Sequence, residues 1–170
     1  MSLTSNEFWT VLHGLIFGSI YLLAFSGGIE GFLGLGKEIS TDIGLKKRLK
    51  RLYIGTTTMA LISWVTIISG TYLVYPWYRA KIPTSPRSLL LANPDKAAWH
   101  TFAMEWKEHV AWFAPILATV VAFLVIYYGK DLVKNEQLRK IIFAIFILAF
   151  ACAAIAGLWG AFINKAAPIM

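Results

Sequence analysis

Four apolar stretches, each long enough to cross a lipid bilayer, constrain the fold of this chain more than any other feature. They cover about residues 8–35, 52–75, 110–129 and 141–164 of the 170-residue sequence. A hydrocarbon core of about 30 Å takes roughly 20 helical residues, and each stretch supplies them. Hydrophobic residues make up 58% of the chain, which exceeds the share in soluble domains. The sequence therefore predicts an all-α fold: a single integral membrane domain built as a four-helix bundle.

The basic residues flank the apolar stretches, although the net charge of +7 alone would also suit a nucleic-acid-binding protein. This pattern favours anchoring at a membrane surface and not binding to nucleic acid. Of the 16 Lys and Arg residues, ten lie in the connections 36–51 and 130–140 and six lie on the other side. The positive-inside rule then places both connections in the cytoplasm and both termini outside it, in a bacterial-type inner membrane.

The connection between the second and third stretches, residues 76–109, is long and changes character along its length. Its first part is rich in proline, which disfavours a helix. Asn93 then offers an N-cap and Pro94 suits a first helical position. We therefore expect the third helix to start there, outside the membrane on the outer side, and to enter the bilayer near His109. We also expect Pro115 to kink this helix and to free a carbonyl group one turn earlier.

Two of the three histidines occupy matching positions in the predicted bundle. His13 lies 24 residues before Lys37, and His109 lies 21 residues before Lys130; each lysine marks the cytoplasmic end of its helix. At about 1.5 Å per residue, both imidazoles fall at nearly the same depth. Histidines at one depth on helices one and three, which run in parallel, are what a haem with two axial imidazoles requires. The sequence thus predicts His13 and His109 as the axial ligands of one haem b iron.

A haem also needs room and cations for its propionates. Gly14 and Gly18 lie next to His13 at four-residue spacing, and the outer half of the fourth stretch is rich in small residues, mainly alanine and glycine. Small residues in this pattern also serve close helix packing in lipid, which is the alternative reading of both glycines. Arg79 is one of several cations placed to meet the propionates. We include Gly14, Gly18 and Arg79 in the expected cofactor site.

The remaining polar residues near the spans have less specific readings. His100 lies nine residues before His109, at the rim of the bilayer or beyond it. A solvated amphipathic face is the expected role for His100, with a metal site, a quinol-binding rim or a docking face as alternatives. Glu105 and Glu108 are candidates to orient a ligand histidine. We expect Glu30, near the inner end of the first span, to reach the membrane surface.

With four spans and the pair His13 and His109, the chain resembles the small four-helix membrane b-type cytochromes that serve as anchors and electron-transfer subunits of respiratory complexes. The resemblance is architectural and not a sequence signature. Members of such groups with two haems use four histidine ligands, whereas this chain has three histidines. The resemblance therefore implies one haem b at most.

Electron transfer through that haem, near the extracytoplasmic face, is the function we expect from the sequence. Electrons would pass between a membrane quinol and an extracytoplasmic partner, within a multi-subunit redox complex; a quinone site is a further possibility. We do not expect catalysis by the chain alone, because the spans carry no evident nucleophile, acid–base pair or metal cluster. The alternative is a cofactor-free anchor whose segment 76–108 docks a partner. A transporter is a weaker third choice, because transport sites need polar groups within the spans and these spans hold few.

Overall fold

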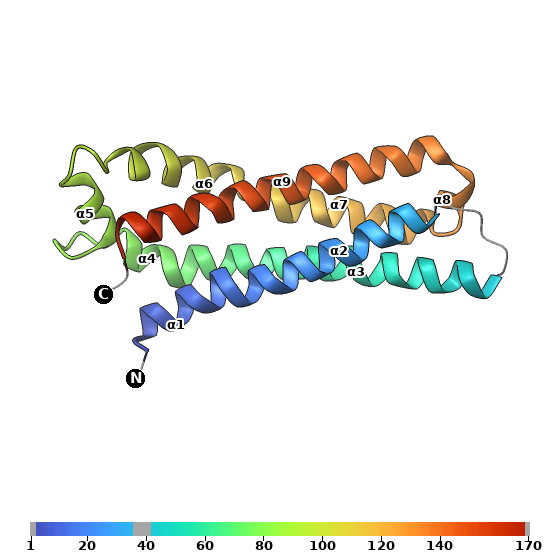
Figure 1. Ribbon diagram of the computed structural model, residues 1–170, viewed down its shortest axis with the longest axis horizontal. Helices are drawn as coiled ribbons and strands as arrows, with labels where there is room; N and C mark the ends of the chain where they lie inside the picture. Colours follow the sequence, from blue (N-terminus) through green and yellow to red (C-terminus); the bar gives the residue numbers. More distant parts are fainter. Residues whose placement is uncertain (1–2, 36–41, 169–170) are drawn as a thin grey trace.

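The structure of the protein is a computed structural model, which describes residues 3–35 and 42–168. Over these residues the chain forms helices joined by turns and contains no strand. Four helices are long and apolar enough to cross a membrane, as predicted: Ser5–Leu35, Asp42–Tyr78, Trp99–Tyr128 and Glu136–Ala166. They run side by side along the long axis of the molecule (Figure 1). Their exposed apolar side chains are suited to contact with a lipid bilayer.

Three of the four long helices consist of shorter segments. The first contains α1 (Ser5–Val11), the π-helical segment η1 (Leu12–Ile16) and α2 (Phe17–Leu35). The second contains α3 (Asp42–Ser69), the π-helical segment η2 (Gly70–Val74) and α4 (Tyr75–Tyr78). The third contains the π-helical segment η3 (Trp99–Met104), α6 (Glu105–Val110) and α7 (Phe113–Tyr128). The fourth is α9 (Glu136–Ala166), and two short helices, α5 (Pro86–Leu91) and α8 (Asp131–Lys134), lie in connections.

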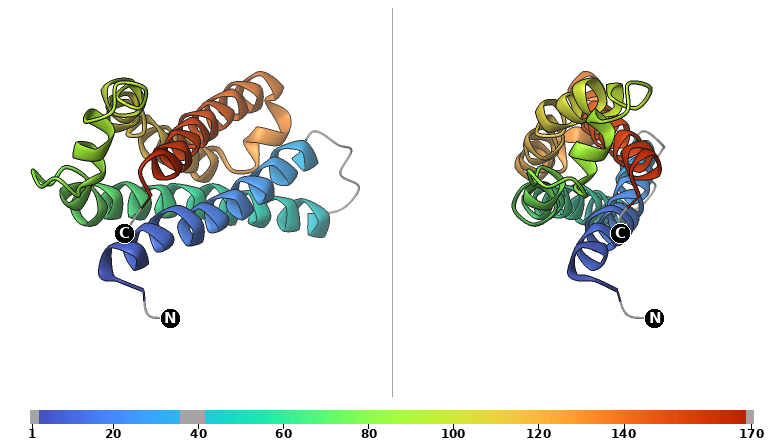
Figure 2. Two further views of the ribbon diagram at one scale, coloured as in Figure 1. Left: turned by 60° about the vertical axis from the view of Figure 1, so that its left-hand side comes forward. Right: turned by 90° about the vertical axis from the view of Figure 1, so that its left-hand side faces the viewer.

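One end of the molecule holds the beginning of α1, the end of α9 and the short helix α5, as Figures 1 and 2 show. We call residues 79–98, which join the second and third long helices there, the cap. The opposite end holds α8 and the beginning of α3 (Figure 1).

Side-chain caps and one glycine fix the helix ends. Thr4 Oγ1 accepts a hydrogen bond from the backbone N–H of Glu7 at 3.3 Å, and the Glu7 carboxylate accepts one from the N–H of Thr4 at 2.7 Å. This reciprocal pair is a capping box at the start of α1. Asn135 Oδ1 accepts from the N–H of Leu138 at 2.9 Å and caps α9. Gly129, with a φ of 46°, ends α7 in a conformation that favours glycine.

Two helices begin at residues other than those the sequence suggested. The second long helix already begins at Asp42, so residues 42–51 of the expected connection are helical. Lys and Arg are good helix formers, and a basic run is compatible with an exposed helical turn. Residues 36–41 of that connection, including the depth marker Lys37, lie outside the described residues.

The third long helix begins at Trp99, five residues after Pro94. Residues 93–97 form consecutive turns instead. The Asn93 side chain accepts a hydrogen bond from the N–H of Asp95 at 2.9 Å, which makes an Asx-turn in place of a helix cap. The expected start of this helix was therefore wrong by about one turn. The Asn93 side chain can form either a helix cap or an Asx-turn, and here it forms the Asx-turn.

The break expected from Pro115 lies one turn earlier, at residues 111–112, between α6 and α7. Proline has no N–H to donate to the carbonyl of Ala111. That carbonyl accepts a hydrogen bond from the N–H of Ala114 at 3.2 Å instead, so the tighter turn satisfies the freed acceptor.

The first two long helices pack closely because glycines meet at their interface. A Cβ atom at Gly55 would lie 2.6 Å from the backbone nitrogen of Gly28, and one at Gly31 would lie 2.8 Å from the Cα of Leu52. Lipid tails are as apolar as the helices, so helix association in a bilayer depends on such close van der Waals contact. These glycines therefore set the distance between α2 and α3.

Aromatic rings join α9 to α2 in the same half of the molecule. Phe25 stacks on Phe150 with ring centroids 3.8 Å apart, and Phe146 is fully buried against Phe25 and Gly28. Stacked rings with large contact areas stabilise a core beyond their area alone. A second buried cluster lies next to the cap and joins it to the ends of the long helices: Tyr78, Leu90, Ala103, Met104, Ile163 and Ala167.

We predict that Gly55→Ala destabilises the protein, because the added methyl group would overlap the backbone of α2. Overpacking of this kind costs about 1–3 kcal/mol. Thermal unfolding in detergent, followed by circular dichroism, measures the effect. Gly27→Ala is the matched control, because a Cβ atom at Gly27 meets nothing within 4 Å. Equal melting temperatures for the two variants would contradict this account of the interface.

Candidate functional site

Polar side chains gather between the long helices, in the half of the molecule that holds the cap. The π-helical segments η1, η2 and η3 lie in this region and contain His13, Gly70 and His100, respectively. Single π-helical turns occur frequently at functional sites, because they shift side chains from their regular helical positions. The region is the candidate functional site of the chain.

His13 lies half-buried against the second long helix. Its ring occupies the space over Gly70, where a Cβ atom would lie 2.6 Å from Cε1 of the imidazole. Its Nδ1 atom lies 3.2 Å from the hydroxyl oxygen of Ser69. The absence of a side chain at residue 70 is therefore what allows the imidazole to sit between the helices.

The hydroxyl group of Ser69 lies beside both His13 and the backbone of its own helix. Ser69 Oγ is 3.0 Å from the carbonyl oxygen of Thr66 and 3.2 Å from Nδ1 of His13. The backbone of Thr66 is also a hydrogen-bond partner of His13. Because a carbonyl can only accept, the imidazole donates a ring N–H toward this helix. A histidine whose ring is oriented by such a hydrogen bond can bind a metal through its other nitrogen.

His109 lies in a different environment from His13. Its Nδ1 atom lies 2.6 Å from the backbone carbonyl of Glu105, which can only accept, so Nε2 is the nitrogen left for another ligand. The residue is exposed, whereas His13 is half-buried. The structure therefore places the two predicted ligands at different distances from the bundle interior.

His100 is buried, with 5% of its surface exposed, and both of its ring nitrogens have partners. Nδ1 lies 3.1 Å from the hydroxyl group of Tyr78, and Nε2 accepts a hydrogen bond from Nε of Arg87 at 3.2 Å. The solvated face expected for His100 is therefore wrong. The side chain instead joins the third long helix to α4 and the cap, and neither nitrogen is free to bind a metal.

Arg79 connects the second and third long helices through two carboxylates. Its Nη2 lies 2.5 Å from Glu105 and 2.8 Å from Glu108, whose Oε2 also accepts from the hydroxyl group of Tyr75 at 3.1 Å. Burial lowers the pKa of Arg79, but the hydrogen bond and charge of Glu108 outweigh it and raise the pKa above its usual value. Arg79 is therefore a permanent cation whose Nη2 is already engaged by two anions.

Lys107 is one of the several cations that the sequence suggested could meet the propionates of a haem. Its side chain is half-buried. A Cβ atom at Gly160 would lie 3.1 Å from Nζ, so this glycine of α9 makes room for the cation. Lys107 and His13 lie within electrostatic range of each other. Glu105, Glu108 and His109 surround it in the sequence, so this part of the third helix is polar.

The two glycines beside His13 do not make close contacts within the described chain. A Cβ atom at Gly14 or Gly18 would meet nothing within 4 Å. Gly14 is exposed and Gly18 is half-buried. The glycines that border the polar side chains are instead Gly70 and Gly160, on the second and fourth long helices.

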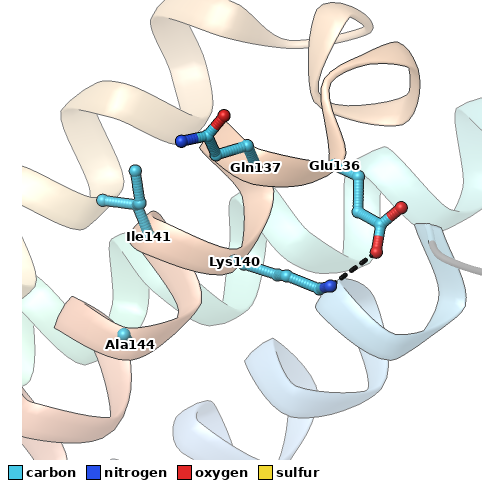
Figure 3. A pocket seen from close by; sticks show the side chains of 5 residues that line it. All are labelled: Glu136, Gln137, Lys140, Ile141 and Ala144. Atoms are coloured by element: carbon cyan, nitrogen blue, oxygen red, sulfur yellow. Dashed lines mark ion pairs between the residues drawn. The ribbon is translucent and has the colours of Figure 1, made fainter.

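Polar groups at the opposite end form surface pairs and not a site. Glu30 pairs with Arg51 on α3, and both side chains are largely exposed, as expected for a residue that reaches the surface. Glu136 and Lys140 form an ion pair at 2.7 Å along α9. A shallow depression of about 570 Å³ lies over this helix face (Figure 3), lined by Glu136, Gln137, Lys140, Ile141 and Ala144. Because one exposed helix face forms it, we do not assign it a function.

In the described part of the chain, no three His, Cys, Asp or Glu side chains gather as a multidentate metal site. Comparisons with models of protein families, with curated proteins and with solved structures found no match. The fold therefore defines the class on its own: an all-helical protein with four helices suited to cross a membrane. Its candidate site is the set of polar side chains between those helices.

We predict that His100→Ala destabilises the cap. The substitution removes a partner of both Tyr78 and Arg87, and a buried polar group without a partner costs about 1–3 kcal/mol. Limited proteolysis should then cleave within residues 79–98 faster than in the unchanged protein. Thr101→Ala, an exposed neighbour in the same π-helical segment, is the control. Identical cleavage rates for the two variants would contradict a structural role for His100.

Proposed function

We propose that this protein is a membrane electron-transfer subunit that carries one haem b, with His13 as an axial ligand. The observation that carries the proposal is a histidine within a membrane-spanning helix, whose Nδ1 lies 3.2 Å from Ser69 Oγ and whose ring occupies the space over Gly70. Ionisable groups within membrane helices are rare and usually functional. The iron of a non-covalent haem is a partner that such a histidine can bind through its other ring nitrogen.

The residues around His13 fit this requirement. Ser69 orients the ring, and Gly70 provides the space that the ring occupies. Such hydrogen bonds to the far nitrogen fix ring orientation and raise ligand basicity. When bound, the haem supplies one-electron chemistry, and the protein's part is to hold it and to tune its reduction potential. Lys107 is a half-buried cation whose charge acts on His13, whereas Arg79 is already paired with two carboxylates, which favours Lys107 for interaction with a negative charge.

The second axial ligand expected from the sequence is His109. Its free Nε2 supports this role, and its exposure means that a haem reaching it would lie toward the outside of the bundle. The proposed haem therefore depends first on His13. A haem with two histidine ligands would also have to reach His109 on the outer face of α6.

We further propose that the cap lies on the extracytoplasmic side, together with both termini. The third long helix has 30 residues, about 45 Å at the α-helical rise, and is longer than a hydrocarbon core of about 30 Å. Its first turns would then project from the bilayer beside the cap. Basic residues gather at the opposite end, in agreement with the positive-inside rule. Electrons would pass between a membrane quinol and an extracytoplasmic partner, within a larger redox complex.

The second candidate function is a cofactor-free anchor that docks an extracytoplasmic partner. The cap favours it, because residues next to it form their own buried cluster around Tyr78 and Leu90, held by the His100 hydrogen bonds. Leu90 of the cap is fully buried against residues of the long helices, so the cap is fixed to the bundle and can present a defined surface. A colourless protein that retains its partners would support this function.

We predict one haem b per chain in the protein purified from membranes of a haem-replete host. A pyridine haemochrome assay measures both the haem type and the amount. His13→Ala should lose the haem, because it removes an axial nitrogen, whereas Lys81→Ala, an exposed cap cation, should keep it. Ser69→Ala should retain the b-type spectrum but bind haem roughly 10–100-fold more weakly. Size-exclusion chromatography in detergent checks that each variant is folded.

A purified wild-type protein without haem would refute the proposal. Full haem occupancy in a folded His13→Ala variant would refute the assignment of His13 but not the presence of haem.

A further inference from the structure

The hydrogen bonds of the buried residue His100 require its imidazole to be neutral. Its Nε2 atom accepts a hydrogen bond from Nε of Arg87 at 3.2 Å. A guanidinium can only donate and is not deprotonated in proteins, so Nε2 has to keep its lone pair. The single ring proton therefore lies on Nδ1, which donates to the hydroxyl oxygen of Tyr78 at 3.1 Å. A second proton on the ring would occupy the lone pair to which Arg87 donates.

These two hydrogen bonds join the third long helix to α4 and to the cap. His100 belongs to η3, Tyr78 to α4 and Arg87 to α5. Leu90, also in α5, is fully buried in the cluster that holds the cap against the long helices. His100 has only 5% of its surface exposed, so water could not hydrate a charge on its ring while the cap is in place. Loss of the contact with Arg87 would therefore act on the helix that anchors the cap.

Charged groups from three parts of the chain act on the ring of His100. Arg87 approaches from α5, Arg79 from the end of α4, and Glu105 and Glu108 from α6. The rings of Trp159 and Phe162, on α9, pack on Trp99 of η3. Both glutamates already bind Arg79.

The two charged groups closest to Nε2 would have opposite effects on a protonated ring. Nε of Arg87 lies 3.2 Å away and would repel it, whereas Oε1 of Glu105 lies 4.0 Å away and would attract it. A protonated Nε2 would then donate to the carboxylate of its own helix in place of accepting from the cap. The same nitrogen thus has one partner in the cap for its neutral form and another in α6 for its charged form.

We propose that His100 is a pH-sensitive switch: protonation of its Nε2 atom breaks the hydrogen bond with Arg87 and releases the cap from the third long helix. Histidine is suited to this role, because its ordinary pKa of about 6.5 lies close to neutral pH. The closed cap holds the neutral ring, whereas the open cap allows either form, so the open form binds more protons. The closed cap is therefore stable above about pH 6.5 and loses stability as the pH falls. The switch needs neither His13 nor a cofactor and is independent of the proposed haem.

Hydrogen–deuterium exchange of the full-length protein in detergent, measured by mass spectrometry over a pH series, tests this proposal. After correction for the intrinsic rate at each pH, exchange in residues 79–98 reports how often the cap opens. We expect this exchange to rise about tenfold between pH 7.5 and pH 5.5, because a free histidine becomes protonated over this range. Exchange in residues 52–60 of α3, which belong to the other buried cluster, should stay unchanged.

Three variants separate the switch from other titrating groups. His100→Gln keeps an amide that can accept from Arg87 but does not titrate, so exchange in the cap should no longer depend on pH. Arg87→Met removes the cation that opposes protonation, so the cap should open more at pH 7.5 and respond less to acid. Lys81→Ala, which removes an exposed cation of the cap, should keep the pH dependence of the unchanged protein.

Equal exchange of the unchanged protein at pH 7.5 and pH 5.5 would overturn the proposal. So would a His100→Gln variant with the pH dependence of the unchanged protein, which would assign the effect to another group. If both the His100 and the Arg87 variants leave the cap open at every pH, ¹⁵N resonances of the His100 ring in the unchanged protein decide. Protonation of this ring over the pH range in which the cap opens supports the switch, and a ring that stays neutral as the cap opens excludes it.

Discussion

The close packing of the first two long helices is the contact on which the rest of the structure depends. Gly28, Gly31 and Gly55 bring the backbones of α2 and α3 together without intervening side chains. In a bilayer, where apolar contact alone gives little driving force between helices, such backbone proximity stabilises association. The same two helices continue toward the cap, where His13 lies over Gly70. The position of the candidate ligand is therefore set by packing that begins several turns away.

The polar side chains of the candidate site divide into two groups with different physical consequences. His100, Tyr78 and Arg87 satisfy one another, and Arg79 joins two glutamates across two helices, so these residues hold the cap in place. Other polar atoms are buried without partners among the described residues: Nε of Arg79, Oε1 of Glu108 and Nε1 of Trp159. Such atoms are uncommon in native structures and usually mark a bound water, an ion or a functional group. They lie in the same half of the protein as His13 and Lys107, which is where we place the cofactor.

The number of long helices and their length could be predicted from the sequence, because a helix that crosses a bilayer needs about 20 apolar residues. Their ends did not follow, since Asn93 suits an Asx-turn as well as a cap and the basic residues 42–51 extend a helix. The depth of a residue along a helix could be counted from the sequence, but the direction in which its side chain points around the helix could not. His109 was chosen for its depth, and its exposure depends on how the third helix is rotated against its neighbours. The contact of Lys107 with Gly160 could likewise be seen only in the structure, because it joins residues far apart in the sequence.

The central proposal is that the iron of a haem binds His13 of this chain. Hyperfine spectroscopy of the ferric protein labelled with ¹⁵N only in histidine tests this most directly, because it counts histidine nitrogens bonded to the iron. The proposal predicts a strongly coupled ¹⁵N nucleus that is lost when His13 is replaced and an exogenous unlabelled imidazole fills its place. The absence of a coupled ¹⁵N nucleus in the haem-loaded wild-type protein, or a spectrum that replacement of His13 leaves unchanged, would contradict it.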